Sequence, residues 1–190
     1  METGRVEVVK ELVIGLRPVY TETGNDTELW LEDGRVLLDR RGLRAVVKAL
    51  ARSFALDLVA QRERVRELLG QTGLVPLCVG GRVLVPLRMR ESRCEHDAAY
   101  GYLDAGQVRE VEARAGGGCL VRLACGSQVE VRSTRATVLK SLDNARRLQG
   151  GEAEAGSEEQ VVQAVRCLLG MLAGMERSLA ELSRRLDGGQ

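Results

Sequence analysis

The chain has little of the material from which most catalytic and metal-binding sites are built. Its 190 residues include one histidine, His96, and five cysteines, an odd number without any CxxC spacing. One histidine excludes sites that need two, and this cysteine usage argues against a disulfide framework and against the common zinc modules. A P-loop, a GxGxxG motif and a GxSxG motif are also absent from the sequence. We therefore expect no enzyme, no metal site and no cofactor.

One short segment keeps an alternative open, because "SRCEHDAAYGYLD" places Cys94, His96, Asp97 and Asp104 close in sequence. Residues two apart on a strand share a face, so a dyad of Cys94 and His96 is sterically possible. A metal site at this place would need further ligands, and Cys119 and Cys125 would serve only if the fold brought them near. The alternative to a non-enzymatic protein is therefore a hydrolase or a metal site in this segment.

Segments that would insert into a membrane or direct secretion are missing as well. The sequence has no run of 18 or more apolar residues, and hydrophobic and charged residues make up 44% and 29% of it. Its start, "METGRVEVVKELVIGL", lacks the basic stretch, the long apolar block and the cleavage site of a secretory signal. We expect a cytoplasmic protein without a membrane partner.

Aromatic residues are scarce and make up only 3% of the chain. Proteins that bind single-stranded nucleic acid stack several bases on aromatic side chains, and this inventory offers no such platform. Trp30 and Phe54 are expected in the core. If the partner is a nucleic acid, duplex DNA is the better candidate.

The sequence repeats itself with an offset of 92 residues. The segment "ELWLEDGRVLLDRRGLRAVVKAL", residues 28–50, returns as "LVRLACGSQVEVRSTRATVLKSL", residues 120–142, with Gly34 aligned on Gly126. Each copy shows two short strands around a glycine turn and then an apolar helical period. The apolar helix positions are Leu43, Val46, Val47, Leu50 and Phe54 in the first copy, and Val138, Leu139, Leu142 and Ala145 in the second. Asp39 and Ser133 or Thr134 are the expected N-caps.

Between the copies, the pattern predicts a helix that ends at Gly70 and a hairpin that turns at Gly80 and Gly81. Residues 99–114 are expected to continue the sheet, and Pro76 and Pro86 indicate edge strands or bulges. The predicted fold is α+β, with pseudo-duplicated strand-turn-strand-helix units that form a mostly β body, plus a C-terminal heptad helix.

Three segments are expected along the chain. A body covers residues 1–149, with repeat units at about 27–54 and 119–146, and an acidic linker covers 150–160. A helix follows at 161–187, because apolar residues recur there with alternating spacings of four and three. They are Val161, Val165, Leu168, Leu172, Met175, Leu179, Leu182 and Leu186. This seam predicts self-association into a homo-oligomer, and docking of the helix on the body is the alternative.

The near-neutral composition, 28 basic against 27 acidic residues, conceals an uneven distribution of charge. Residues 35–150 carry 21 Lys and Arg against 12 Asp and Glu, whereas both flanking segments are acidic. A basic body suits a partner with a phosphate backbone. The expected DNA-binding residues are Arg35, Arg40, Arg41, Arg44, Lys48 and Arg52 near the first helix, with Arg41, Arg44, Lys48 and Arg52 on one ridge, and Arg132, Arg135, Lys140, Arg146 and Arg147 near the second.

The same charges also permit a second interpretation. The basic positions would then be a solvated surface, and the chain would be a non-enzymatic interaction or scaffold protein whose heptad helix binds a partner. Salt-dependent binding to duplex DNA separates the two interpretations.

The segment "RVLLDRRGLRAVVKALARSFALDLVAQRERVRELLGQTGLVPLCVGGRVLVPLRMRESRC", followed by "CLVRLACGSQVEVRSTRATVLKSL", resembles the bacterial competence transcription factor family, ComK. The similarity covers about residues 25–148 and lies in pattern and spacing. Cys94 is followed here by Glu95, His96 and Asp97, where the family usually continues with Gly-Trp-Ile. Each half is also similar to a LytTR-type DNA-binding unit.

This resemblance implies a cytoplasmic transcriptional activator that binds A/T-rich promoter DNA as an oligomer in the circuit for DNA uptake. Apart from the resemblance, a regulatory protein partner is also expected. The resemblance assigns no residue roles, so the DNA-binding residues named above depend on charge and position alone.

Overall fold

The computed structural model describes residues 2–22, 24–95 and 97–150. The chain divides into two compact units, Met1–Leu148 and Gln149–Gln190. The predicted heptad helix and all but the first residue of the predicted acidic linker lie outside the described residues. The fold described below is that of the first unit.

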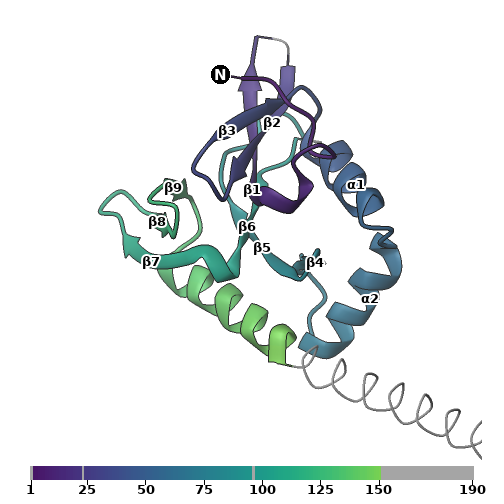
Figure 1. Ribbon diagram of the computed structural model, residues 1–190. Coiled ribbons are helices and arrows are strands. Elements are labelled where there is room, and N and C mark those ends of the chain that lie inside the picture. Colours follow the sequence, from purple (N-terminus) through teal and green to yellow (C-terminus); the bar gives the residue numbers. More distant parts are fainter. Residues whose placement is uncertain (1, 23, 96, 151–190) are drawn as a thin grey trace, which may run out of the picture. The chain divides into compact units, whose positions relative to one another are not determined.

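A six-stranded antiparallel sheet forms the centre of this unit (Figure 1). Its strands are β1 (Val13–Thr21), β2 (Gly24–Leu31), β3 (Val36–Asp39), β4 (Leu77–Val79), β5 (Arg82–Arg88) and β6 (Tyr100–Asp104), in the order β3-β2-β1-β6-β5-β4. Two local hairpin systems therefore meet at the pair β1–β6, whose register joins only Gly15 to Leu103 and Leu16 to Tyr102. We call this pair the seam.

A separate three-stranded sheet follows the turn η2 (Ala105–Gln107). It has the order β7 (Val108–Ala113), β8 (Cys119–Leu123) and β9 (Gln128–Val131), and a helix over residues 135–150 comes after it. The remaining elements are the turn η1 (Lys10–Leu12) and the helices α1 (Leu43–Ser53) and α2 (Leu58–Leu69). The predicted α+β class with a mostly β body is confirmed, and the helix over residues 135–150 is the one predicted to follow the second hairpin.

Both predicted repeat segments fold as strand, turn, strand and helix, and their turns share one hydrogen-bond pattern. In the first, the Gly34 amide donates to the Leu31 carbonyl at 2.9 Å, and in the second the Gly126 amide donates to the Leu123 carbonyl at 3.0 Å. Both glycines have φ of +84°, a left-handed conformation that disfavours any other residue. The first hairpin belongs to the six-stranded sheet and the second to the smaller one, so pseudo-duplication of the whole units stays a prediction.

The two faces of the six-stranded sheet are covered by different elements, because side chains alternate along each strand. Leu16, Leu29 and Leu84 on one face pack in a cluster with Val46 and Leu50 of α1. The opposite face packs in another cluster with the small sheet and the C-terminal helix; this cluster includes Ile14, Val85, Leu103, Val121, Val129, Val138 and Leu142. The two helices that follow the repeated hairpins therefore lie on opposite faces of the central sheet.

Most local predictions between the copies are confirmed. The second helix ends before Gly70, which has the left-handed φ of +61° of a C-cap, and a two-residue turn at Gly80 and Gly81 joins β4 to β5. Pro86 lies in the part of β5 beyond its pairing with β4, where the strand is an edge. Trp30 is 9% exposed and belongs to the core, as expected.

Three local predictions are wrong. Residues 99–114 were expected to continue the sheet, but only β6 does so, because the Asp104 side chain accepts from the Gly106 amide at 3.0 Å and caps a turn that leads into the other sheet. Leu139 is 40% exposed, since it lies beside the apolar face of its helix and not on it. Asp39 caps no helix; Gly42 is the N-cap of α1, and the Asp39 side chain is buried at the end of β3.

Candidate nucleic-acid interface

The exposed side of α1 carries three cations one helical turn apart. Leu43, Val46, Val47, Leu50 and Ala51 fill the buried side of the helix. Arg44, Lys48 and Arg52 are all exposed, and their spacing of four residues places them along one side over about 12 Å. None of the three has a carboxylate within 4.0 Å among the described residues. Three cationic side chains are therefore available for a ligand.

Arg40 extends this set at the start of α1. It is exposed, and it lines a cavity of about 360 Å³ together with Arg5 of the N-terminal segment. No ion pair of Arg40 occurs within the described ranges. We call Arg40, Arg44, Lys48 and Arg52 the α1 cations.

Arg41 was predicted to lie on the same ridge, and this prediction is wrong. It precedes the helix, and its guanidinium is held by two carboxylates, Glu7 at 2.7 Å and Asp39 at 2.6 Å. The hydrogen bonds from Arg41 lower the pKa of the Glu7 carboxyl to about 2, and those to Asp39 and Glu7 raise the pKa of the guanidinium. Asp39, only 2% exposed, also accepts a hydrogen bond from the Val6 amide. Arg41 is a structural residue that ties the N-terminal segment to β3.

Arg35 is partly neutralised in a similar way, although at the surface. Its backbone amide and its side chain both bond Asp33 in the β2–β3 turn, and the Nε to Oδ2 distance is 2.8 Å. These bonds lower the pKa of the Asp33 carboxyl. The pair is exposed on both sides, so it holds Arg35 only weakly.

The cations of the second repeat are divided between paired and unpaired ones. Arg132 forms an ion pair with Glu91, and the Arg135 Nε donates to the Val111 carbonyl at 3.2 Å. Lys140, Arg146 and Arg147 are exposed, and no ion pair involves them within the part of the chain described here. Because the two basic helices cover opposite faces of the central sheet, the structure does not gather the predicted cations on one surface.

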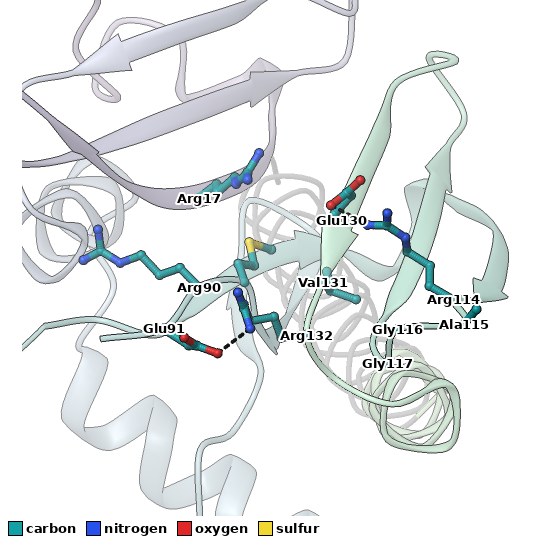
Figure 2. A pocket seen from close by; sticks show the side chains of 11 residues that line it. Arg17, Arg90, Glu91, Arg114, Ala115, Gly116, Gly117, Glu130, Val131 and Arg132 are labelled. Carbon is teal, nitrogen blue, oxygen red and sulfur yellow. Dashed lines mark hydrogen bonds and ion pairs between the residues drawn. The ribbon is translucent and has the colours of Figure 1, made fainter. Parts of the chain in front are cut away.

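A groove between the two sheets holds a further set of cations that sequence reasoning largely missed. It has a volume of about 740 Å³ and is lined by Arg17, Met89, Arg90, Glu91, Arg114, Ala115, Gly116, Gly117, Glu130, Val131 and Arg132 (Figure 2). We call it the inter-sheet groove. Its residues come from four separate parts of the chain, so no linear motif marks it. Only the order of the strands brings them together.

Three of the arginines that line this groove form ion pairs. Arg132 pairs with Glu91, and Arg114 pairs with Glu130. Arg17 lies 3.7 Å from Glu28, which is an ion pair without a hydrogen bond. Arg90 extends away from the other arginines in Figure 2, and its Nη2 donates to the Asn25 Oδ1 at 2.8 Å.

The segment with Cys94 is anchored by Asp97. The Asp97 carboxylate accepts hydrogen bonds from Tyr20, Asn25 and the backbone amides of Arg93 and Cys94, which lower its pKa to about 2. Arg90 and Arg93 stack on the Tyr20 ring at 3.9 and 4.2 Å. Cys94 itself is exposed. His96 lies outside the described residues, so the predicted alternative of a Cys94–His96 dyad is untested.

Among the described residues, no group of three or more His, Cys, Asp or Glu side chains is arranged to hold a metal ion. Within the same residues, no helix is both long and apolar enough to span a membrane.

Comparisons with family models, with curated proteins and with solved structures gave no match to this chain.

Proposed function

We propose that this protein is a double-stranded DNA-binding transcriptional regulator that contacts the phosphate backbone through the α1 cations. The supporting observation is the contrast between these residues and their neighbours. Arg41 is held by Glu7 and the buried Asp39, whereas Arg40, Arg44, Lys48 and Arg52 have no acidic partner in the described part of the chain. Cations without partners suit an external polyanion.

Binding of this kind has a defined dependence on salt. Each cation at a phosphate releases condensed counterions, so four contacts correspond to a slope of log K against log[salt] of roughly −4. The contacts carry little sequence information by themselves, because phosphates position a protein and base edges specify the site. The preference for A/T-rich promoters and the activator role are what the resemblance to ComK adds to this proposal.

The two repeat units supply a matched pair of variants, because Lys48 and Lys140 are 92 residues apart and occupy equivalent places. Both side chains are exposed. Lys48→Glu should weaken binding to a mixed-sequence duplex and reduce the size of the salt slope by about one. Lys140→Glu, which changes the charge by the same amount, should leave the affinity and the salt slope nearly unchanged if α1 is the contact surface. Fluorescence anisotropy over a salt series measures both quantities.

Two results would contradict the proposal. No duplex binding at low salt would favour the alternative of a scaffold protein. Equal losses in the two variants would mean that net charge, and not the α1 surface, governs the affinity.

A further inference from the structure

The inter-sheet groove has features that the α1 surface lacks. Arginines line it from three places, Arg17 on β1, Arg114 at the end of β7 and Arg132 after β9, and each of them forms an ion pair. Cationic groups therefore stand on both sides of one concave space. None of the α1 cations lines it.

The arginines of the groove remain accessible although they form ion pairs. The side chains of Arg114 and Arg132 are 50% and 54% exposed, and their partners Glu130 and Glu91 are 62% and 67% exposed. Exposed pairs contribute little to stability and are open to competition. A guanidinium has five N–H donors, and a single carboxylate accepts only some of them. Phosphate oxygens can therefore bind the remaining donors or displace the carboxylates.

The β7–β8 turn forms part of the lining of the same space. The Arg114 amide donates to the Gly118 carbonyl at 3.2 Å, and the Gly117 amide donates to the Arg114 carbonyl at 3.0 Å. Between them, the amides of Ala115 and Gly116 have no hydrogen-bond partner within the described residues, and both residues line the groove. Consecutive free amides in a turn are a recurrent anion-binding arrangement.

The size of the groove suits a small-molecule ligand. Its volume of about 740 Å³ lies within the range of small-molecule sites, roughly 300–1,000 Å³. We propose that the inter-sheet groove binds a small ligand with two or more linked phosphate groups, of the size of a nucleoside triphosphate. This site is independent of the proposed DNA contact.

Calorimetric titration of the full chain tests the site with three probes: ATP, inorganic pyrophosphate and adenosine. ATP and pyrophosphate should bind, and adenosine should not. Arg114→Gln and Arg132→Gln should each weaken ATP binding roughly tenfold or more, since each removes charged hydrogen bonds to phosphate. Arg109→Gln is the matched control, because Arg109 is exposed on β7 and does not line the groove.

A variant with increased affinity keeps the test informative if the arginine variants fold poorly. Glu91→Gln removes the carboxylate that competes for Arg132, so it should tighten ATP binding several-fold. The proposal is overturned if pyrophosphate and ATP do not bind at millimolar concentration, or if binding survives in the double variant Arg114→Gln, Arg132→Gln. It is also overturned if Lys48→Glu abolishes ATP binding, because the nucleotide would then occupy the α1 surface. Duplex binding of the same variants, measured in parallel, reports on the DNA proposal separately.

Discussion

Arg41 shows how a single residue acquires its role from distant partners. Its neighbours in sequence, Arg40 and Arg44, are exposed, yet Arg41 is held between Glu7 and the buried Asp39. The spacing of basic residues in the sequence does not distinguish Arg41 from Arg40 and Arg44. The pairing with Glu7 spans 34 residues and exists only because the N-terminal segment lies against β3, where the Gly4 amide donates to the Leu38 carbonyl. The sequence could therefore predict the charge at this position but not its use.

Replacing Arg41 tests this structural role. Arg41→Gln leaves Asp39 buried without its cation, so it should lower the free energy of unfolding by about 3 kcal/mol. Arg35→Gln is the control, because it breaks an exposed pair and should change stability by less than about 0.5 kcal/mol. Urea denaturation of both variants measures these values, and equal losses would contradict the assignment.

The same substitution should alter the dependence of stability on pH. Because the pKa of Glu7 is about 2 in the fold and is higher in the unfolded chain, its contribution is complete above pH 5 and is lost as the pH falls toward 2. In Arg41→Gln the carboxyl loses the partner that lowers its pKa. The decrease in stability between pH 5 and pH 2 should therefore be smaller in the variant.

At the scale of elements, local signals predicted most of what proved correct. The period of α1, the end of α2 at Gly70 and the turn at Gly80 and Gly81 depend on neighbouring residues only. What the sequence could not supply is the order of strands. β7 follows β6 directly in the chain but joins a different sheet, and the inter-sheet groove exists only because of that change.

At the seam between β1 and β6, the close approach of the two strands depends on Gly101. A Cβ at Gly101 would lie 2.4 Å from the Leu16 carbonyl oxygen and 2.3 Å from the Met89 sulfur. The backbone oxygen cannot yield without separating the strands, so Gly101→Ala should lower the free energy of unfolding by about 2–4 kcal/mol.

Gly73→Ala is the matched control for this prediction. Its Cβ would meet nothing within 4 Å, and its backbone needs no left-handed conformation. The change should stay within about 0.5 kcal/mol in thermal or urea unfolding. A Gly101→Ala protein as stable as Gly73→Ala would show that the seam tolerates a side chain.

At the scale of the whole molecule, the chain combines a body with a tail whose predicted heptad lies outside the described residues. The body has its own cores on both faces of the central sheet. We expect the full chain to sediment as an oligomer and a chain truncated after Gln149 as a monomer, because the apolar heptad positions of the tail need a partner helix. If analytical ultracentrifugation shows that the full chain and the truncated chain are both monomers, the result instead favours docking of the tail on its own body.

The placement of the two basic helices also matters at this scale. The repeat correctly predicted two hairpins with similar turns, but it could not show that their helices cover opposite faces. A straight duplex that contacts α1 would therefore leave the helix at 135–150 free for other partners.

The late pairing of β1 with β6 also affects the protein while it is being synthesised on the ribosome. β1 can pair with β2 as soon as both have left the ribosome, but its other edge has no partner until Leu103 emerges, 88 residues after its partner Gly15. At ordinary elongation rates this interval lasts roughly ten seconds. During that time the nascent chain displays the unpaired edge of β1, with the apolar residues Val13, Ile14 and Leu16 at its start, so conditions that slow translation in this interval should favour aggregation of the newborn protein over its folding.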